Sequence, residues 1–467
     1  MSLSQALIEI DRALGDGRVV TDREVLTTYS RDESEAAPVM PDAVVRVRDA
    51  KETLAVMRAA ASHRIPVTPR AGGTGRTGGS IPLAGGIVIA FEQCNRIKGI
   101  ERDDMVIVVE PGVITGKLHE AVEAHGLFYP PDPNSLSTCA IGGNVAENAG
   151  GPRALRYGCT RDYVLGMQVV TAGGELLNLG KRTVKGVTGY DLTSLMVGSE
   201  GTLGIITEIT LKLLPKPEGL ATLLALLPDL PSAGRAVTEL LGRGMLPRCL
   251  ELLDEHTLRL VRAEAGLPLD ERANALLLVE LDGDLTALDA QLERAGNALT
   301  DAGALQVLVA RHGSERERLW AARRELSRAL RKVAKNKLAE DVVVPRSRIP
   351  QLIDRCRSIS DAYGIPMPAY GHAGDGNIHV NFLWNDESEY PRVQRAVEEL
   401  FKLTIELGGT LSGEHGIGIL KAPYLPLEQA PELIALQERV KALFDPQNIL
   451  NPGKIFPSHL ARFHGGC

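Results

Sequence analysis

The amino-acid sequence predicts an α+β protein of two or three domains, on three observations. The chain has 467 residues, more than a single hydrophobic core usually organises. Strand-like and helix-like patterns alternate along it, as in the apolar runs at residues 86–91 and 105–112 and the amphipathic stretch that follows. A Pro-rich break, LLPKPEG at residues 213–219, separates two stretches that each show this alternation.

The stretch before the break begins with elements of both kinds. Residues 4–15, SQALIEIDRALG, have the apolar spacing of an amphipathic helix. Residues 42–75 are typical of a strand, a helix, a second strand and a glycine-rich loop. Residues 115–126, TGKLHEAVEAHG, predict a helix that ends on a glycine, which is a common helix terminator.

After the break, short strands and helices alternate as in a small α+β layer. We expect strands at residues 220–227 and 275–283, and helices at residues 232–244 and 285–303. A long basic helix is predicted after these, at about residues 314–336.

Composition excludes several classes of function. The formal net charge is −7, which argues against nucleic acid as a partner. The six cysteines include no CxxC pair, so the chain carries neither a zinc-ribbon nor a ferredoxin-type cluster motif, and we expect free thiols. The N-terminal segment lacks the features of a signal peptide, and no apolar run approaches the roughly 20 residues that span a bilayer. We expect a cytoplasmic protein, with at most a peripheral contact to the inner membrane, and a homodimer is one expected assembly.

A glycine-rich loop, PRAGGTGRTGG at residues 69–79, contains GxGxxG as Gly73, Gly75 and Gly78. A Rossmann site requires a helix directly after these glycines, because the helix N-terminus holds the pyrophosphate. Here Pro82 and a further strand follow instead, so we reject a Rossmann site. The loop can still bind phosphate through bare backbone N–H groups, and taken alone it also fits a plain flexible loop.

Two further blocks follow the glycine loop, at residues 129–166 (YPPDPNSLSTCAIGGNVAENAGG and onward) and 185–217 (KGVTGYDLTSLMVGSEGTLGIITEI and onward). Together the three blocks resemble the FAD-binding domain of the vanillyl-alcohol oxidase superfamily, which implies a PCMH-type fold of two subdomains. The loop at residues 69–80 has no histidine, so the flavin is expected to be non-covalent. The FAD contacts that the resemblance implies are Arg70, Gly72, Gly73, Thr74, Gly75, Gly78, Pro131, Ser135, Thr138, Gly142, Gly143, Asn144, Asn148, Glu200 and Ile206.

Residues 370–381, YGHAGDGNIHVN, predict a hairpin that carries two histidines. A turn at Gly374–Gly376 allows His372 and His379 to lie on one face, and His379 shares that face with Asn381 because side chains alternate along a strand. Downstream, residues 408–418, GGTLSGEHGIG, supply Glu414 and His415. Two imidazoles and a carboxylate suit a divalent ion such as Zn²⁺ or Mn²⁺, although a hairpin with incidental histidines is the alternative.

GHAGDGNIHVN and GEHGIG also resemble the FAD-linked oxidase C-terminal domain of D-lactate dehydrogenases, glycolate oxidase flavoprotein subunits and D-2-hydroxyglutarate dehydrogenases. The resemblance implies that His372, His379 and Glu414 bind the metal, that Asn381 touches the substrate and that His415 is the base. With FDPQNILNPGKIF at residues 444–456, which includes a predicted flavin contact at Asn451, it covers nearly the whole chain. The expected division is an FAD-binding domain at residues 1–217, a cap domain with an antiparallel sheet at 218–440, and a C-terminal segment at 441–467 that returns to the FAD domain.

The predicted basic helix contains a candidate anchor for a substrate carboxylate. At 100° per residue, Arg323 falls on the arc of Leu319, Leu326, Leu330 and Val333, whereas the neighbouring Arg324 falls outside it. A buried arginine needs a partner, and a carboxylate can pair with it bidentately. The family resemblance implies the same role for Arg323 and adds a hydroxyl at Ser327.

These features predict an FAD-dependent, metal-assisted enzyme that oxidises a D-2-hydroxy acid. In the hydroxyglutarate enzymes a lysine stands two residues before an aspartate that opens a strand, and here that position is Ala339, with Lys337 nearby. D-Lactate or glycolate is therefore favoured, and D-2-hydroxyglutarate is the first alternative. An alkylglycerone-phosphate-synthase-like flavin transferase is an alternative of another class. The electron acceptor stays open among a quinone, an electron-transfer flavoprotein, a cytochrome and an iron–sulfur partner subunit.

Overall fold

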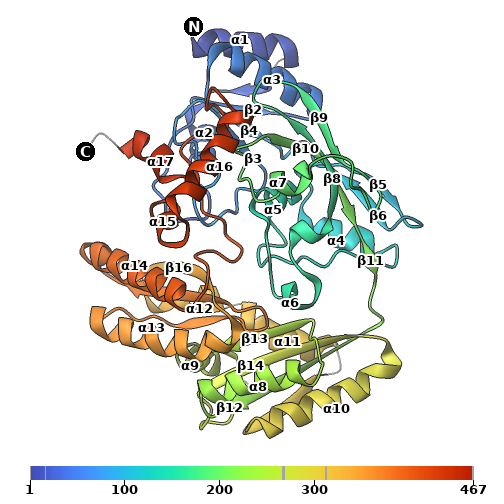
Figure 1. The fold of residues 1–467 in the computed structure, drawn as a ribbon, viewed down its shortest axis with the longest axis vertical. Coiled ribbons are helices and arrows are strands. Elements are labelled where there is room, and N and C mark those ends of the chain that lie inside the picture. The colour runs from blue at the N-terminus through green and yellow to red at the C-terminus, as the bar shows by residue number, and fades with distance from the viewer. Residues whose placement is uncertain (1, 16, 266–268, 311–312, 325, 465–467) are drawn as a thin grey trace. The chain divides into compact units, whose positions relative to one another are not determined.

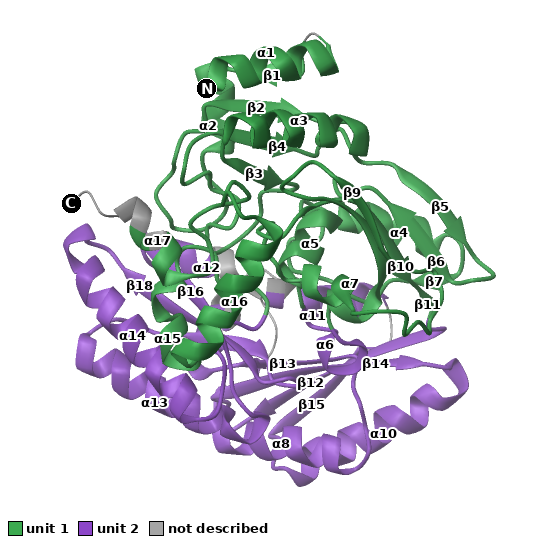
Figure 2. Cartoon of the chain, turned by 45° about the horizontal axis from the view of Figure 1, so that its top comes forward, with its two compact units in different colours: residues 1–150, 159–216, 414–467 green, residues 151–158, 217–413 purple. Residues whose placement is uncertain are grey.

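The chain folds into two compact units. The computed structural model describes residues 2–15, 17–265, 269–310, 313–324 and 326–464. Unit 1 comprises residues 1–150, 159–216 and 414–467, and unit 2 comprises residues 151–158 and 217–413 (Figure 2). Each unit combines helices with an antiparallel sheet, and unit 1 also has a smaller, mostly parallel sheet; this confirms the α+β class.

Unit 1 contains two main sheets and one short ribbon (Figure 1). The first sheet has the order β1-β2-β4-β3, with β2, β4 and β3 parallel: Val19–Val20, Ala43–Arg46, Ile87–Ala90 and Val67–Arg70. The second is antiparallel in the order β5-β6-β10-β8-β9: Ile97–Glu101, Val106–Val109, Ile205–Lys212, Val164–Val170 and Leu176–Gly180. The ribbon pairs β11, Leu214–Pro215, with β7, Leu127–Phe128.

The helices of unit 1 are α1 to α5, α7 and α15 to α17: Leu3–Leu14, Arg23–Tyr29, Ala50–His63, Thr115–Glu123, Ile141–Glu147, Leu192–Met196, Leu425–Glu428, Pro431–Phe444 and Pro457–His464. Helices α1 and α3 pack against the first sheet through Ile10 and Met57, which join Val45, Ile89 and Val170 in one apolar core. Asp49 caps the N-terminus of α3 by accepting a hydrogen bond from the backbone N–H of Glu52 at 2.9 Å.

Unit 2 is built on one antiparallel sheet in the order β15-β12-β14-β13-β17-β18-β16. The strands in that order are Gln306–Ala310, Gly219–Leu227, Ala275–Gly283, Cys249–Leu253, Ala369–His372, Asn377–Trp384 and Asn336–Val343. The helices are α6 and α8 to α14: Ala154–Tyr157, Leu230–Gly242, Glu255–Ala265, Leu285–Asp301, Gly313–Arg324, Leu326–Val333, Ile349–Tyr363 and Tyr390–Glu406.

The two faces of this sheet differ in what they carry. Leu253 and Leu278 lie on the face where α9, α11 and α12 pack, and Leu319 and Leu330 belong to the same core. Leu252, one residue along β13, faces the opposite side together with residues of α8 and α13. The first face becomes polar toward β17, β18 and β16, and the candidate site lies there.

The expected domain boundaries after residue 217 and after residue 440 stay predictions. By their contacts, residues 1–150, 159–216 and 414–467 belong to unit 1. Within that unit, Glu200 accepts hydrogen bonds from the backbone N–H groups of Ile417 and Gly418, both at 2.8 Å. Residues 151–158 also join unit 2, where Tyr157 donates to Asp282 at 2.7 Å.

The predicted basic helix at residues 314–336 corresponds to α11 and α12, and residue 325 lies outside the described residues. Leu319, Leu326 and Leu330 are buried as expected. The expectation for Val333 is wrong: its side chain is 53% exposed, because it is the last residue of α12, where the chain leaves the helix. Within the described parts of the chain, every helix is too short or too polar to span a lipid bilayer.

Candidate active site

One face of the unit 2 sheet gathers polar side chains from four adjacent strands. In the strand register, Glu251 on β13 lies opposite His372 on β17, and His379 on β18 lies opposite Asp341 on β16. Asn381, two residues after His379, lies opposite Ala339. Because side chains alternate between the faces of a strand, these residues project from the same side of the sheet.

The hairpin predicted from the sequence is present as β17 and β18. His372 pairs with Asn377, and a four-residue loop, Ala373–Gly376, joins the strands. Gly376 has a φ of 93°, and a Cβ there would lie 2.0 Å from the carbonyl oxygen of Val344. Only glycine fits this position, so the loop sequence fixes the register that turns His372 and His379 to one face.

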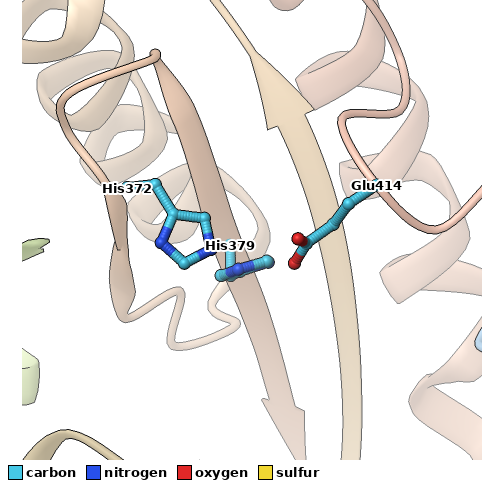
Figure 3. Close-up of side chains that lie close together, drawn as sticks. All are labelled: His372, His379 and Glu414. Carbon is cyan, nitrogen blue, oxygen red and sulfur yellow. The ribbon is translucent and has the colours of Figure 1, made fainter. Parts of the chain in front are cut away.

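His372, His379 and Glu414 form a group that can hold a metal ion. One ligand atom from each lies within 4.8 Å of the others, and Figure 3 shows the three side chains turned toward one another. Glu414 directly follows Gly413, whose backbone N–H donates to Oδ2 of Asp341 at 2.9 Å. Two imidazoles and one carboxylate are a donor set for Zn²⁺ or Mn²⁺, so the residues present fit a divalent ion.

Glu251 is a residue of the candidate site that the sequence analysis did not identify. Its side chain is fully buried, and its two oxygens accept hydrogen bonds from Nδ1 of His372 at 2.5 Å and from Nε of Arg323 at 2.7 Å. Burial by itself raises the pKa of the Glu251 carboxyl, but His372 and Arg323 outweigh burial and hold that pKa below its usual value. The available signal was a single acid within the apolar strand CLELL.

Arg323 faces inward from α11, as the helical arc predicts. Its side chain is 11% exposed, and its guanidinium lies 4.6 Å from the centroid of the Tyr370 ring. Of the five N–H donors of an arginine, the bond to Glu251 uses Nε, so the terminal edge of the guanidinium can face a carboxylate. The side chains of Arg324 and Ser327 lie outside the described part of the structure.

Asn381 provides a buried acceptor beside His379. Its Nδ2 donates to the carbonyl oxygens of Pro368 and His379, both at 3.2 Å. Its Oδ1 is buried and has no hydrogen-bond partner among the described residues. An unsatisfied buried acceptor is costly, so this atom fits a donor brought by a ligand, such as a hydroxyl group.

His415, the predicted base, lies in the segment that returns to unit 1. Its Nε2 is 3.9 Å from Oε1 of Glu414, and its side chain is 20% exposed. Its carbonyl oxygen accepts a hydrogen bond from Oγ1 of Thr77 at 3.0 Å, and two residues later Glu200 holds the backbone. Thr77 is therefore a further residue of the site that sequence reasoning did not single out.

In unit 1 the predicted flavin segments lie against one another. A Cβ on Gly72 would lie 2.9 Å from the backbone N of Ala140 and 3.0 Å from the carbonyl oxygen of Thr138, so the glycine loop packs directly on the IGGN segment. A Cβ on Gly142 would collide with Pro111 at 2.4 Å, whereas a Cβ on Gly143 would meet only Ala71, at 3.9 Å. The closely packed glycines shape a wall, and at Gly143 a Cβ would be in ordinary van der Waals contact.

Asn451 and Asp32 each carry a buried acceptor atom in unit 1 that lacks a partner within the described residues. Asn451 donates from Nδ2 to the carbonyl oxygens of Gly79 and Glu200, at 2.8 and 2.7 Å, but its Oδ1 is unpaired. Oδ2 of Asp32 is also unpaired, and it lies 3.4 Å from a Cβ built on Gly75. The flavin ring N–H and the hydroxyls of FAD are donors of the required kind, so the residues present fit this cofactor.

Three predicted FAD contacts have side chains that bond within the protein. Asn144 accepts from Thr115, Asn148 accepts from the backbone N–H of Arg161 at 2.9 Å, and Glu200 accepts from residues 417 and 418. Burial is the main reason that the pKa of Glu200 is raised. These side chains hold the walls of the candidate flavin site in place, and their direct contact with FAD stays a prediction.

Arg70, near the start of the glycine loop, donates hydrogen bonds to two nearby residues. Its Nη1 donates to the carbonyl oxygen of Arg31 at 2.7 Å and to Oγ of Ser80 at 3.2 Å, and burial lowers its pKa. Lys454, which sequence reasoning passed over, is buried in the same unit and donates to the carbonyl oxygen of Ile81. Burial lowers the pKa of Lys454 to about 7. The remaining predicted contacts also lie in unit 1: Gly73, Thr74, Gly78, Pro131, Ser135, Thr138 and Ile206.

A glycine-lined site with unpaired acceptors and a sheet face with a metal-ligand group define a flavin-dependent oxidoreductase. Family models agree: one described as an FAD binding domain matches residues 41–180, and one described as the C-terminal domain of FAD linked oxidases matches residues 216–455. The chain belongs to the family of FAD-linked oxidases, and FAD is its cofactor.

Named relatives and a solved structure agree with this assignment. The chain is 42% identical to the glycolate oxidase subunit GlcD of Bacillus subtilis, over 92% of both proteins. It is 35% identical to a D-lactate dehydrogenase of Anaerostipes hadrus, over 96% of this chain and 97% of the relative. The crystal structure of p-cresol methylhydroxylase superposes with a TM-score of 0.82 at 17% identity, covering 97% of this chain and 96% of that one, which confirms the predicted PCMH-type fold.

Proposed function

We propose that this enzyme oxidises a short D-2-hydroxy acid, D-lactate or glycolate, to the 2-oxo acid with the help of a divalent metal ion. The observation that carries the proposal is the set of groups on one sheet face of unit 2. A metal-ligand pair, His372 and His379, lies beside the unpaired Oδ1 of Asn381, and Arg323 reaches the same face through Glu251. A 2-hydroxy acid presents a hydroxyl and a carboxylate on adjacent carbons, which such groups can bind together.

The roles of the protein groups follow from their chemistry. Arg323 pairs its terminal N–H groups with the substrate carboxylate and so fixes the orientation of the 2-carbon. Asn381 accepts a hydrogen bond from the substrate hydroxyl and keeps it next to the metal ligands. His415 takes the hydroxyl proton, as suits an imidazole near neutral pH.

A metal ion and FAD would supply what side chains cannot. His372, His379 and Glu414 would hold the divalent ion, which would supply Lewis acidity toward the substrate hydroxyl. FAD, held in unit 1, would supply the hydride acceptor for the 2-carbon. The final electron acceptor would lie outside this chain, and the name of the B. subtilis relative, a glycolate oxidase subunit, supports a partner subunit in that role.

A short substrate is favoured over D-2-hydroxyglutarate by the chemistry of β16. The position opposite Asn381 is Ala339, whose methyl group offers no donor to a second carboxylate. Lys337, two positions before Ala339 in β16, lies on the same face of the sheet, but it is buried. The group of His372, His379 and Glu414 argues against the alkylglycerone-phosphate-synthase-like transferase. The family resemblance implies that such a transferase does not use a metal hairpin with two histidines.

The experiment is anaerobic flavin reduction with a panel of hydroxy acids. D-Lactate, glycolate, L-lactate and D-2-hydroxyglutarate are each mixed with the yellow enzyme, and loss of the oxidised-flavin absorbance is followed by stopped flow. We expect fast bleaching by D-lactate or glycolate and slow bleaching by the other two. Fast bleaching by D-2-hydroxyglutarate alone would transfer the assignment to that substrate, and no bleaching by any of the four would contradict the proposed reaction class.

A further inference from the structure

We infer that Glu251 is a positioning residue that couples the metal ligand His372 to the carboxylate anchor Arg323 through one shared carboxylate. This inference rests on the proposed function, because it assigns a role toward the metal and the substrate. Glu251 is not a member of the ligand group, and among the described residues it contacts the site through His372 and Arg323.

The geometry makes Glu251 a bridge between two functional side chains. Each of its oxygens serves one partner: Oε1 lies 2.5 Å from Nδ1 of His372, and Oε2 lies 2.7 Å from Nε of Arg323. Glu251 is directly opposite His372 in the register of β13 and β17, so the sheet itself sets the distance between their side chains. The Glu251 side chain is fully buried, which strengthens both interactions relative to solvent.

The first consequence concerns the choice of nitrogen on His372. An ionised carboxylate only accepts, so it holds the proton of the imidazole on Nδ1. Nε2 is then the ring nitrogen that can bind a metal together with His379 and Glu414. A carboxylate behind a histidine ligand also increases the basicity of that ligand, and loss of such a partner typically lowers metal affinity about 10- to 100-fold.

The second consequence concerns the orientation of Arg323. The bond from Nε to Glu251 and the packing of the guanidinium over the Tyr370 ring, at 4.6 Å, fix its plane. The terminal edge is therefore held in one direction before a substrate arrives, which reduces the entropy lost on binding. Glu251 thus acts on metal binding and on substrate binding at the same time.

The test uses Glu251→Gln in the FAD-loaded enzyme. The amide keeps the shape of the side chain but can accept at only one of its two ends, so one partner faces an N–H group instead of an acceptor. We expect the dissociation constant for Mn²⁺ or Zn²⁺, measured by competition with a chromogenic chelator, to rise about 10- to 100-fold. The KM for the hydroxy acid should rise as well, while the FAD content stays unchanged.

The matched control is Glu280→Gln. Glu280 is also a buried acid on the same face of the sheet, one strand further along, where it accepts from Nε1 of Trp320 at 2.8 Å and pairs with Arg248 at 3.1 Å. It touches neither His372 nor Arg323. A merely structural role for Glu251 predicts that both variants lose thermal stability and metal affinity alike, whereas the inference predicts that only Glu251→Gln loses metal affinity.

The measured metal affinities decide whether the inference holds. An unchanged metal affinity in Glu251→Gln, or an equal loss in Glu280→Gln, overturns the inference. If Glu251→Gln does not fold, Glu251→Asp keeps the charge but withdraws it by one methylene from both partners, and a metal affinity equal to that of the wild type then overturns the inference. Absence of metal binding in the wild-type enzyme is a different result, because it contradicts the proposed metal site itself.

Discussion

Replacing Arg323 with methionine should separate substrate binding from the rest of the site. Methionine keeps a helix-compatible side chain of similar length but removes the charge that we assign to the substrate carboxylate. The loss of one partner of a buried, charge-assisted pair costs about 2–5 kcal/mol, which corresponds to roughly a 30- to 5,000-fold decrease in kcat/KM. Because the carboxylate is present in the ground state and in the transition state, much of the loss should be a rise in KM.

Arg323→Met should also lower the free energy of unfolding. Removing one partner of a buried ion pair costs about 3–5 kcal/mol when the remaining charge has no other partner. Glu251 keeps its bond to His372, at 2.5 Å, so we expect the lower end of this range. For a unit of this size, about 3 kcal/mol lowers the Tm by roughly 6–12 °C. Activity is therefore measured well below the Tm, with FAD content checked.

Arg318→Met is the control on the same helix. The Arg318 side chain is exposed, so its replacement should change kcat/KM and stability by no more than about 0.5 kcal/mol. The assay is steady-state kinetics with the best hydroxy acid for both variants. Equal losses in the two variants, or an unchanged KM in Arg323→Met, would mean that the carboxylate binds elsewhere.

The remaining predictions test the cofactors, the base and the buried thiols. Acid precipitation should release all FAD into the supernatant, because the glycine loop has no histidine to attach it; flavin retained in the pellet contradicts this. Chelation should abolish turnover while FAD stays bound, Mn²⁺ or Zn²⁺ should restore it, and His379→Ala should mimic chelation; full activity in a metal-free sample would remove the metal from the mechanism. His415→Ala should retain FAD and metal but slow flavin reduction by about 10²-fold or more, and a normal rate would exclude His415 as the base. Burial raises the pKa of the Cys94 and Cys356 thiols to about 12, so both stay protonated from pH 7 to 9, and peptide mapping should find neither alkylated by iodoacetamide before unfolding.

Local patterns in the sequence predicted those features of the candidate site that are set by residues close together in the chain. The hairpin follows from the glycines around Asp375 and from strand alternation, and both histidines lie on the expected face. The inward direction of Arg323 follows from helical periodicity, and its 11% exposure agrees. The same periodicity fails at Val333, because an arc computed for a continuous helix does not apply where the helix ends.

The partners of these residues could not be predicted, because they are distant in the chain. Glu251 is 121 residues from His372 and 72 residues from Arg323. A lone acid in an apolar strand indicates a buried partner but not which one. Only the pairing of β13 with β17 brings Glu251 opposite His372, and this pairing is a property of the whole sheet rather than of either strand.

Backbone hydrogen bonds hold the short segment that carries Glu414 and His415 on both sides of this pair. Before the pair, Asp341 of unit 2 accepts from the backbone N–H of Gly413 at 2.9 Å. After it, Glu200 of unit 1 accepts from the backbone N–H groups of residues 417 and 418 at 2.8 Å. Both acids are buried. Because backbone N–H groups are held, the sequence of the segment alone gives no sign of either contact. The residues that flank the proposed metal ligand and the proposed base are held by acids that lie 72 and 217 residues away in the chain.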